Sequence, residues 1–198
     1  MRKQASLVTV ALWLVPTALL GQRPQTLMNG PIHSGGFGGP VVRFSDLDGD
    51  LGILVGGRGG WIINHTFVIG GGGYGLANPD NFERLDSRGN TVELTMGYGG
   101  LELEYIPAWY RVVHPSFQVL VGAGGATWDD RFRGGAQYDD DAFFVVEPGA
   151  NLMVNVAEVF RLGFGVSYRL TGDVELEGLD AGALDGASGY LTFKFGRF

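Results

Sequence analysis

Few side chains in this sequence are of the types that perform nucleophilic or acid–base chemistry. The three histidines are His33, His65 and His114, and their spacing along the chain repeats no metal-ligand pattern. Ser116 follows His114 by two positions, and the two are of the residue types that act as nucleophile and base. Pro115 lies between them and restricts the backbone. His114 and Ser116 are therefore the candidate catalytic pair, and the alternative is that they are ordinary structural residues.

Carboxylates at short intervals are the candidate metal ligands. Asp46, Asp48 and Asp50 lie in the segment Asp-Leu-Asp-Gly-Asp, and further acidic clusters occupy 129–130 and 139–141. Such oxygens suit Ca²⁺. The first segment lacks the downstream glutamate of a helix–loop–helix calcium site, so a turn is the simpler interpretation. No cysteine occurs, which excludes thiolate clusters, disulfides and a lipoprotein attachment site. We expect no bound metal.

Composition argues against two further classes of function. Gly70, Gly72 and Gly75 have the spacing of a dinucleotide-binding loop, but no helix is expected after them to receive a pyrophosphate. The formal net charge of the chain is -7, which opposes binding to nucleic-acid phosphates. We therefore expect no cofactor and no nucleic-acid partner.

The N-terminal segment predicts export. Arg2 and Lys3 precede an apolar run over 5–20, and small residues lie near its end. This order of charged, apolar and small residues is typical of a cleaved secretory signal. The alternative is an uncleaved membrane anchor, but the run is short and Pro16 interrupts it. We predict a signal peptide over 1–21.

Period-2 alternation places strands along the rest of the chain. In the clearest example, Phe160, Phe164 and Tyr168 share one face, while Arg161 and Arg169 share the other with glycine and serine. Bulky residues opposed to isolated charges among glycines are typical of an apolar exterior around a narrow polar interior, although a soluble sandwich also alternates. After a polar lead over 22–35, eight strands are predicted at 36–45, 51–63, 66–77, 91–105, 116–128, 142–155, 159–171 and 187–198.

The connections between these strands differ in length in a regular way. Tight turns are expected at 64–65 and 156–158, whereas 78–90, 129–141 and 172–186 are long and rich in Asp and Gly. If the first strand runs outward from the periplasm, all three long segments lie outside and both tight turns lie inside. Two connections fit less well, since 46–50 is a short outer loop and 106–115 is a rather long inner one. Short periplasmic turns and long external loops are the rule for membrane barrels.

Glycines and charges together describe the expected interior. Glycine accounts for 35 of the 198 residues, and runs of it in mid-strand leave room for large neighbours inside a small barrel. Glu93 has the opposite parity to Glu102 and Glu104, so a face change near Gly99 is predicted to bring all three carboxylates inside. Buried ions should pair and plug the lumen, with a thin wetted path as the alternative. The predicted inward charges are Arg43, Arg58, Glu93, Glu102, Glu104, Glu147, Arg161, Arg169 and Lys194.

Aromatic residues lie near the expected strand ends. Trp128 and Tyr168 approach the outer ends, while Trp61, Tyr105 and Trp109 lie near the inner ends. Such a distribution is typical of the two aromatic girdles of a membrane barrel, with ordinary core packing as the alternative.

The last strand ends the chain on an aromatic residue. Phe193 and Phe195 lie on its apolar face, but Phe198 has the parity of Lys194. Phe198 therefore reaches lipid only if the strand slips by one residue near Gly196. With the signal, the alternating strands and the inward charges, this ending resembles small bacterial outer-membrane β-barrel proteins, such as the outer-membrane protein A barrel and the outer-membrane protein X group.

The resemblance covers 36–198 and implies an all-β, eight-stranded antiparallel up-and-down transmembrane barrel in the bacterial outer membrane. It implies outer-membrane lipids as surroundings and the barrel-assembly machinery as a partner that reads the final aromatics, Phe193, Phe195 and Phe198. The expected function is a non-enzymatic role in envelope structure, or in surface interaction with an extracellular partner through acidic loops.

Three alternatives accompany this expectation. Outer-membrane lipid deacylases of comparable size use a His-x-Ser pair, as His114 and Ser116 would form, but the predicted topology places this pair at the inner rim rather than near the outer leaflet. The second alternative is a narrow pore. The third is a soluble secreted β-barrel, which would share the alternation of the strands.

Overall fold

The computed structural model describes residues 32–85, 89–130, 136–172, 174, 176, 179 and 182–198, and of residues 130 and 136–139 the backbone only. The predicted signal peptide over 1–21 and most of the predicted lead over 22–35 lie outside the described residues. Among the described residues, no helix is both long enough and apolar enough to cross a membrane.

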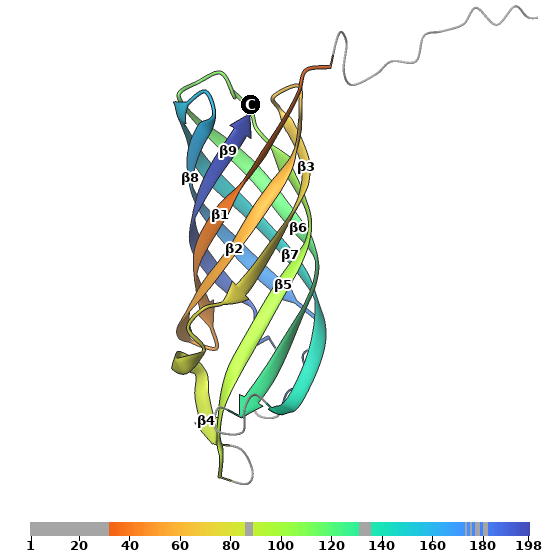
Figure 1. The fold of residues 1–198 in the computed structure, drawn as a ribbon, viewed down its shortest axis with the longest axis vertical. Helices are drawn as coiled ribbons and strands as arrows, with labels where there is room; N and C mark the ends of the chain where they lie inside the picture. Colours follow the sequence, from red (N-terminus) through yellow and green to blue (C-terminus); the bar gives the residue numbers. More distant parts are fainter. Residues whose placement is uncertain are drawn as a thin grey trace, which may run out of the picture. The chain divides into compact units, whose positions relative to one another are not determined.

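Eight long strands follow one another along the described chain (Figure 1). A 3-10 helix, η1 (Pro79–Phe82), and a short strand, β4 (Glu83–Leu85), lie between the third and fourth of them. All eight predicted strands are confirmed, and the largest departure is that the sixth begins at Ala136 rather than at residue 142. The long strands are β1 Ser34–Leu47, β2 Asp50–Ile63, β3 Phe67–Leu76, β5 Thr91–Tyr105, β6 Val113–Asp130, β7 Ala136–Ala157, β8 Phe160–Thr171 and β9 Gly186–Arg197.

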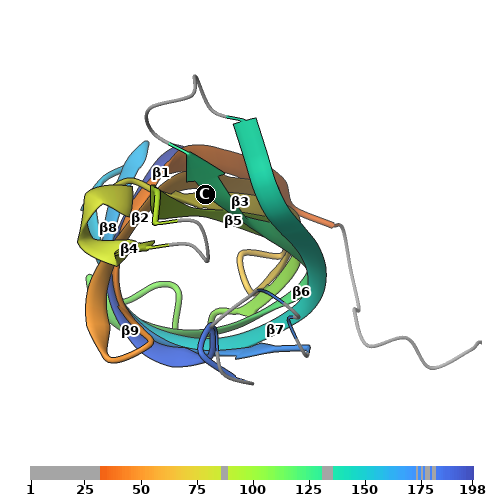
Figure 2. The same cartoon turned by 90° about the horizontal axis from the view of Figure 1, so that it is seen from below.

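The long strands form one closed antiparallel sheet in sequence order. Each strand pairs with the next, β3 pairs with β5 past η1 and β4, and β9 returns to pair with β1. The closing register runs from Gly36↔Arg197 to Ser45↔Ser188. Figure 2 shows the resulting ring of strands from below. Since β9 pairs with β1, the sheet closes and leaves no unpaired edge. Since the strands pair in sequence order, the fold is the predicted eight-stranded up-and-down barrel.

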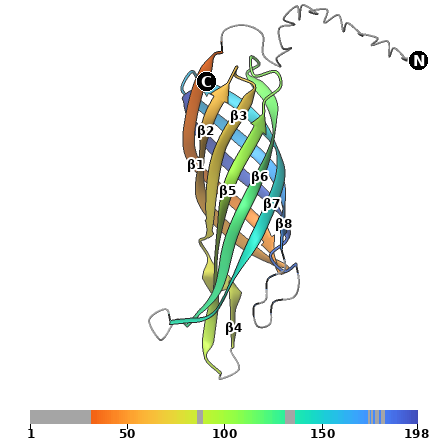
Figure 3. The same cartoon turned by 90° about the vertical axis from the view of Figure 1, so that its right-hand side faces the viewer.

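The turns at 64–66 and 158–159 lie at one end of the barrel, and the connection that carries β4 lies at the other (Figures 1 and 3). Two connections depart from a division into short and long: residues 48–49 join β1 to β2 at the end that carries β4, and the longer connection over 106–112 lies at the opposite end. We call the end with the turns at 64–66 and 158–159 the turn end, and the end that carries β4 the loop end. The connections over 77–90 and 172–185 lie at the loop end, as predicted. The predicted loop over 129–141 is largely strand instead, because β6 and β7 continue to pair as far as Asp130↔Ala136.

The outer face of the barrel is apolar. Trp61, Tyr105 and Tyr168 are among the exposed aromatics, as predicted, but Trp128 is only 5% exposed and faces inward with the other even-numbered residues of β6. Its predicted place in an outer girdle was therefore wrong. The exposed large side chains on strands include Phe44, Val55, Trp61, Phe67, Ile69, Leu101, Leu103, Tyr105, Phe117, Val121, Phe144, Val146, Leu152, Phe164, Val166, Tyr168, Leu170 and Phe195.

The predicted face change in β5 does not occur. Pairing with β6 is continuous from Val92↔Asp130 to Tyr105↔Phe117, so residues of one parity keep one face along the whole strand. Glu102 and Glu104 are buried inside, whereas Glu93 lies on the opposite face and is half-buried. The prediction of Glu93 as an inward charge was therefore wrong. Between Glu93 and Glu102, the even-numbered residues of β5 are apolar, aromatic or glycine. They face the interior in the same register as Glu102 and Glu104, without a bulge.

Glycines leave space for large inward side chains. A Cβ added at Gly165 would lie 2.5 Å from Cε2 of Tyr190 and would also overlap Asn151. A Cβ added at Gly72 would lie 2.5 Å from Glu102 Oε1 and 2.8 Å from the Tyr74 hydroxyl oxygen. The glycine-rich strands therefore make room for the polar side chains that fill the interior.

Replacing Gly165 by alanine should destabilise the barrel by about 1–3 kcal/mol, because the new methyl group overpacks against Tyr190. Urea unfolding in lipid vesicles measures the change in the free energy of unfolding. Gly189→Ala is the matched control, because a Cβ at Gly189 meets nothing within 4 Å, and its effect should stay within about 0.5 kcal/mol. Equal effects of the two variants would contradict the close approach.

Candidate functional site

The centre of the barrel holds a group of ion pairs that joins strands far apart in the sheet. Arg58 on β2 places Nε 2.7 Å from Glu102 Oε2 and Nη2 3.1 Å from Glu104 Oε2. Lys194 on β9 donates from Nζ to both oxygens of Glu104, at 2.7 and 2.6 Å. Because β2, β5 and β9 are not neighbours of one another in the sheet, these contacts cross the interior.

A further ion pair lies beside this group, and Tyr74 contacts both. Arg43 on β1 forms an ion pair with Glu147 on β7. The hydroxyl of Tyr98 donates to Glu147 Oε2 at 2.7 Å, and that of Tyr74 donates to Glu102 Oε1 at 2.6 Å. The guanidinium carbon of Arg43 lies 4.0 Å from the ring centroid of Tyr74, which links the two groups.

These contacts define the central ion cluster, a set of three cations and three carboxylates. Each member is at most 5% exposed, so each has lost nearly all of its hydration. Desolvation of that extent is tolerated only when opposite charges and hydrogen bonds compensate it. Here three cations face three carboxylates, so the charges compensate one another. The members are Arg43, Arg58, Glu102, Glu104, Glu147 and Lys194.

The two remaining predicted inward cations are also buried, but they contact other groups. Arg161 is 7% exposed and its guanidinium carbon lies 4.0 Å from the ring centroid of Phe198. Arg169 is fully buried, and its Nε donates to the carbonyl oxygen of Leu184 at 2.6 Å. The structure therefore brings six of the nine predicted charges into one cluster, places these two towards the ends of the barrel, and leaves Glu93 outside.

Apolar layers lie on both sides of the central ion cluster. At the turn end, Phe37, Ile62, Val68 and Ile106 form a buried group against which Trp109 and Phe198 pack. At the loop end, a larger apolar group lies inside the barrel and against the connections. Its larger members include Leu47, Leu54, Phe82, Leu94, Leu120, Trp128, Phe143 and Leu184.

The terminal Phe198 belongs to the turn-end layer and not to the outer face. Its ring stacks on Phe37 at a centroid distance of 6.3 Å and lies beside Arg161. The pairing of β8 with β9 is continuous as far as Phe160↔Phe195, and Gly196 pairs with Phe37 in the same register as the rest of β9. The slip near Gly196 that would carry Phe198 to the outer face does not occur, and Phe198 keeps the inward parity of Lys194.

The candidate catalytic residues face the interior near the turn end. His114 is 1% exposed and Ser116 is fully buried. His114 Nδ1 lies 3.0 Å from the carbonyl oxygen of Arg111, while Ser116 Oγ accepts a hydrogen bond of 3.2 Å from Asn151 Nδ2. Each side chain thus has a partner of its own, and both are covered by the barrel wall from any lipid outside.

The candidate calcium segment is a tight hairpin turn. Asp48 and Gly49 have φ angles of 52° and 85° and connect β1 to β2 by two residues, which matches the simpler interpretation from the sequence. Asp46 Oδ1 accepts a hydrogen bond from the backbone N–H of Gly49 at 3.2 Å. Asp46, Asp48 and Asp50 are all exposed.

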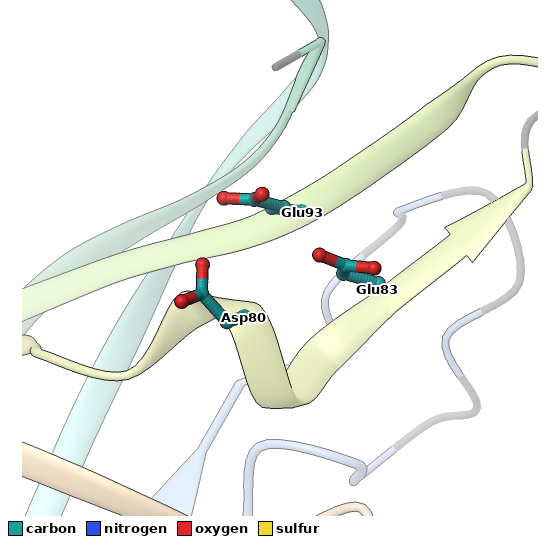
Figure 4. A group of neighbouring side chains, drawn as sticks. All are labelled: Asp80, Glu83 and Glu93. Atoms are coloured by element: carbon teal, nitrogen blue, oxygen red, sulfur yellow. The ribbon is translucent and has the colours of Figure 1, made fainter.

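Sequence reasoning missed another set of carboxylates, which Figure 4 shows. Asp80 on η1, Glu83 on β4 and Glu93 on β5 place carboxylate oxygens within 4.8 Å of one another. They are separated along the chain and meet because β4 pairs with β5, with Glu83 directly opposite Glu93. Acidic groups near a surface gather in this way without a metal, so the arrangement is a cluster of charges and not by itself a site.

Comparison with known proteins identifies the architecture. No protein-family model matches the sequence, and no curated protein matches it. Neisserial surface protein A has a similar structure, with a TM-score of 0.56 and 14% identity over 85% of this chain and 99% of that one. The N-terminal barrel of Pseudomonas aeruginosa OprF (TM-score 0.49, 15% identity, 82% and 96% covered) and Yersinia pestis Ail (0.48, 12%, 82% and 97%) also match. At 14% identity, the similarity to Neisserial surface protein A shows a shared fold.

Replacing Glu104 by glutamine should cost about 3–5 kcal/mol of unfolding free energy, because Arg58 and Lys194 then remain buried without their shared carboxylate. Urea unfolding in lipid vesicles measures the loss. Glu158→Gln, at an exposed turn, serves as the control and should change stability little. In the double variant Glu104→Gln/Lys194→Met, part of the loss should be recovered, since one unpaired cation is gone; an undiminished loss would contradict the pairing.

Proposed function

We propose that this chain is an integral protein of the bacterial outer membrane, with a closed interior and without enzymatic activity, that acts in envelope structure or in surface contacts through its loop end. Outer-membrane lipids surround it in this proposal. The exposed apolar outer face of a closed barrel is the observation that carries it.

The outer face supports a membrane location on physical grounds. Val55 on β2 is 47% exposed, Leu101 on β5 is 52% exposed and Val166 on β8 is 66% exposed, and no two of these strands are neighbours in the ring. A soluble barrel would have a polar exterior, whereas contiguous exposed apolar surface marks contact with another apolar phase. A closed sheet also satisfies its backbone hydrogen bonds internally, as hydrocarbon surroundings require.

The arrangement of the ends supports one orientation. The turn end, with its short turns and the C-terminal residue, matches the periplasmic side of such barrels, and the loop end matches the external side. Exposed carboxylates at the loop end include Asp48, Asp50 and Glu83. In this orientation an extracellular partner would meet an acidic surface, and the barrel-assembly machinery would act on β9.

The interior supports a plugged lumen. The central ion cluster crosses the barrel, and apolar layers lie on both sides of it. Ions entering such an interior would have to displace Arg58, Glu104 and Lys194 from one another and pass two hydrophobic groups.

Enzymatic deacylation of lipid has less support. A deacylase needs its nucleophile accessible to an acyl chain, but Ser116 is fully buried and lies near the turn end, away from the proposed external leaflet. The similar solved structures are likewise named as surface, attachment or outer-membrane proteins.

Cell fractionation tests the proposed location. The protein should be found in the outer-membrane fraction and should migrate faster on SDS gels before heating than after, because a closed barrel resists SDS at room temperature. Recovery as a soluble protein, or one mobility under both conditions, would contradict the membrane barrel.

Planar-bilayer recording tests the proposed closed interior. The purified protein should give no single-channel steps, since the central ion cluster and both apolar layers obstruct the lumen. A porin inserted in the same bilayers provides the positive control. Reproducible conductance steps from the folded protein would favour the narrow pore instead.

A further inference from the structure

A cavity of about 220 Å³ lies at the loop end of the barrel. Its lining comes from the β1–β2 turn, the segment η1–β4, the ends of β5 and β6, and described residues of the connection before β9. Its apolar wall includes Leu47, Phe82, Leu94 and Leu184. The central ion cluster does not contribute to its lining, so the cavity is a separate feature of the interior.

Trp128 lines this cavity and has an unused hydrogen-bond donor. The residue is 95% buried, being 5% exposed, yet its Nε1 has no hydrogen-bond partner among the described residues. Arg84, whose guanidinium carbon lies 4.6 Å from the ring centroid of Trp128, also has a buried Nε without such a partner. Buried donors in proteins are nearly always satisfied by protein, ligand or water, so two orphan donors beside one cavity point to an acceptor within it.

We propose that this cavity binds a small apolar molecule that presents a neutral hydrogen-bond acceptor, such as a carbonyl oxygen, to Nε1 of Trp128. The proposal goes beyond the envelope role above and does not depend on whether the lumen conducts. It also gives Trp128 a role that its inward position leaves open, since this residue belongs neither to the outer girdle nor to the ion cluster.

The volume of the cavity sets the size of the ligand. An apolar protein cavity of about 150 Å³ takes up benzene. A cavity of about 220 Å³ therefore accommodates one aromatic ring with a short substituent. Apolar contact with Leu94 and Leu184 supplies the favourable burial, and the single acceptor fixes the orientation.

The charges around the cavity favour a neutral ligand over an anion. Among the described lining residues, Asp48, Asp50 and Glu83 contribute carboxylates and Arg84 contributes a cation. Asp48 and Asp50 are exposed, so they stand at the rim that faces the surroundings of the loop end. An incoming carboxylate ligand would be repelled by three like charges, whereas a ketone, ester or amide would not.

The experiment compares two probes that differ in the acceptor alone. Acetophenone carries a ring and a carbonyl oxygen, and ethylbenzene has nearly the same shape without that oxygen. The ¹⁵N–¹H signal of the Trp128 indole is followed in the full barrel reconstituted in lipid nanodiscs, and the Trp128→Phe variant assigns it. Trp61, 52% exposed on the outer face, reports partitioning of the probes into lipid.

Acetophenone should move the Trp128 indole signal saturably and towards lower field, as a new hydrogen bond does, and should bind up to about tenfold more tightly than ethylbenzene. Benzoate, which carries a negative acceptor, should bind more weakly than acetophenone. Ala183→Leu, which adds bulk to the cavity wall, should abolish the shift.

Three results would overturn the proposal: no saturable shift of Trp128, equal affinity for acetophenone and ethylbenzene, or binding that survives Ala183→Leu. Heat-dependent migration of the same samples on SDS gels reports the barrel itself. Loss of binding with an intact barrel therefore rejects the cavity proposal alone, and loss of the mobility change with wild type rejects the proposed membrane barrel.

Discussion

Closure of the sheet between β1 and β9 is the constraint on which the other features depend. Backbone pairing from Gly36↔Arg197 to Ser45↔Ser188 removes both edges that an open sheet would expose. With only eight strands, closure also fixes an interior little wider than the side chains that point into it. Every inward side chain therefore packs against side chains from the facing wall, and every outward side chain contacts the medium around the barrel.

This narrow interior explains why charges and glycines occur together. Arg58, Glu104 and Lys194 meet across the barrel because long side chains from opposite walls can reach one another. They fit only where other positions have no side chain, as at Gly72 beside Glu102 and Tyr74. Hydrophobic groups could fill the same volume, so the ion cluster is weak evidence of stability in itself. It nevertheless penalises any shift of β5 or β9, since a slip of one residue would place Glu104 or Lys194 in the wall's outer face.

The fold and most of the interior could be predicted from the sequence because strand alternation is local. Phe160 to Arg169 shows both faces of β8 directly, and all eight strands were located by the same pattern. The partners of the charges could not be predicted, because parity says which face Arg43 occupies but not that Glu147 lies opposite it across the interior.

Residue type alone is a poor guide to the face that a side chain occupies. Its charge favours an inward place for Glu93, yet it lies in a part of β5 that pairs with β4, where the outward face meets Asp80 and Glu83. An aromatic ring favours an outer girdle for Trp128, and Phe198 could reach lipid only through a slip of β9, yet the parity of the strands directs both inward. In each case the unbroken backbone register was stronger than the preference of the side chain.

The composition of the central ion cluster also ties it to closure of the ring. Five of its six members lie on strands β1 to β7, and Lys194 lies on β9, which closes the ring against β1. Without β9, Arg43 and Arg58 would face three carboxylates, so the cluster would carry one excess negative charge. The strand that supplies the closing backbone pairs thus also supplies the cation that neutralises the cluster, and a chain cut short before β9 would lack both.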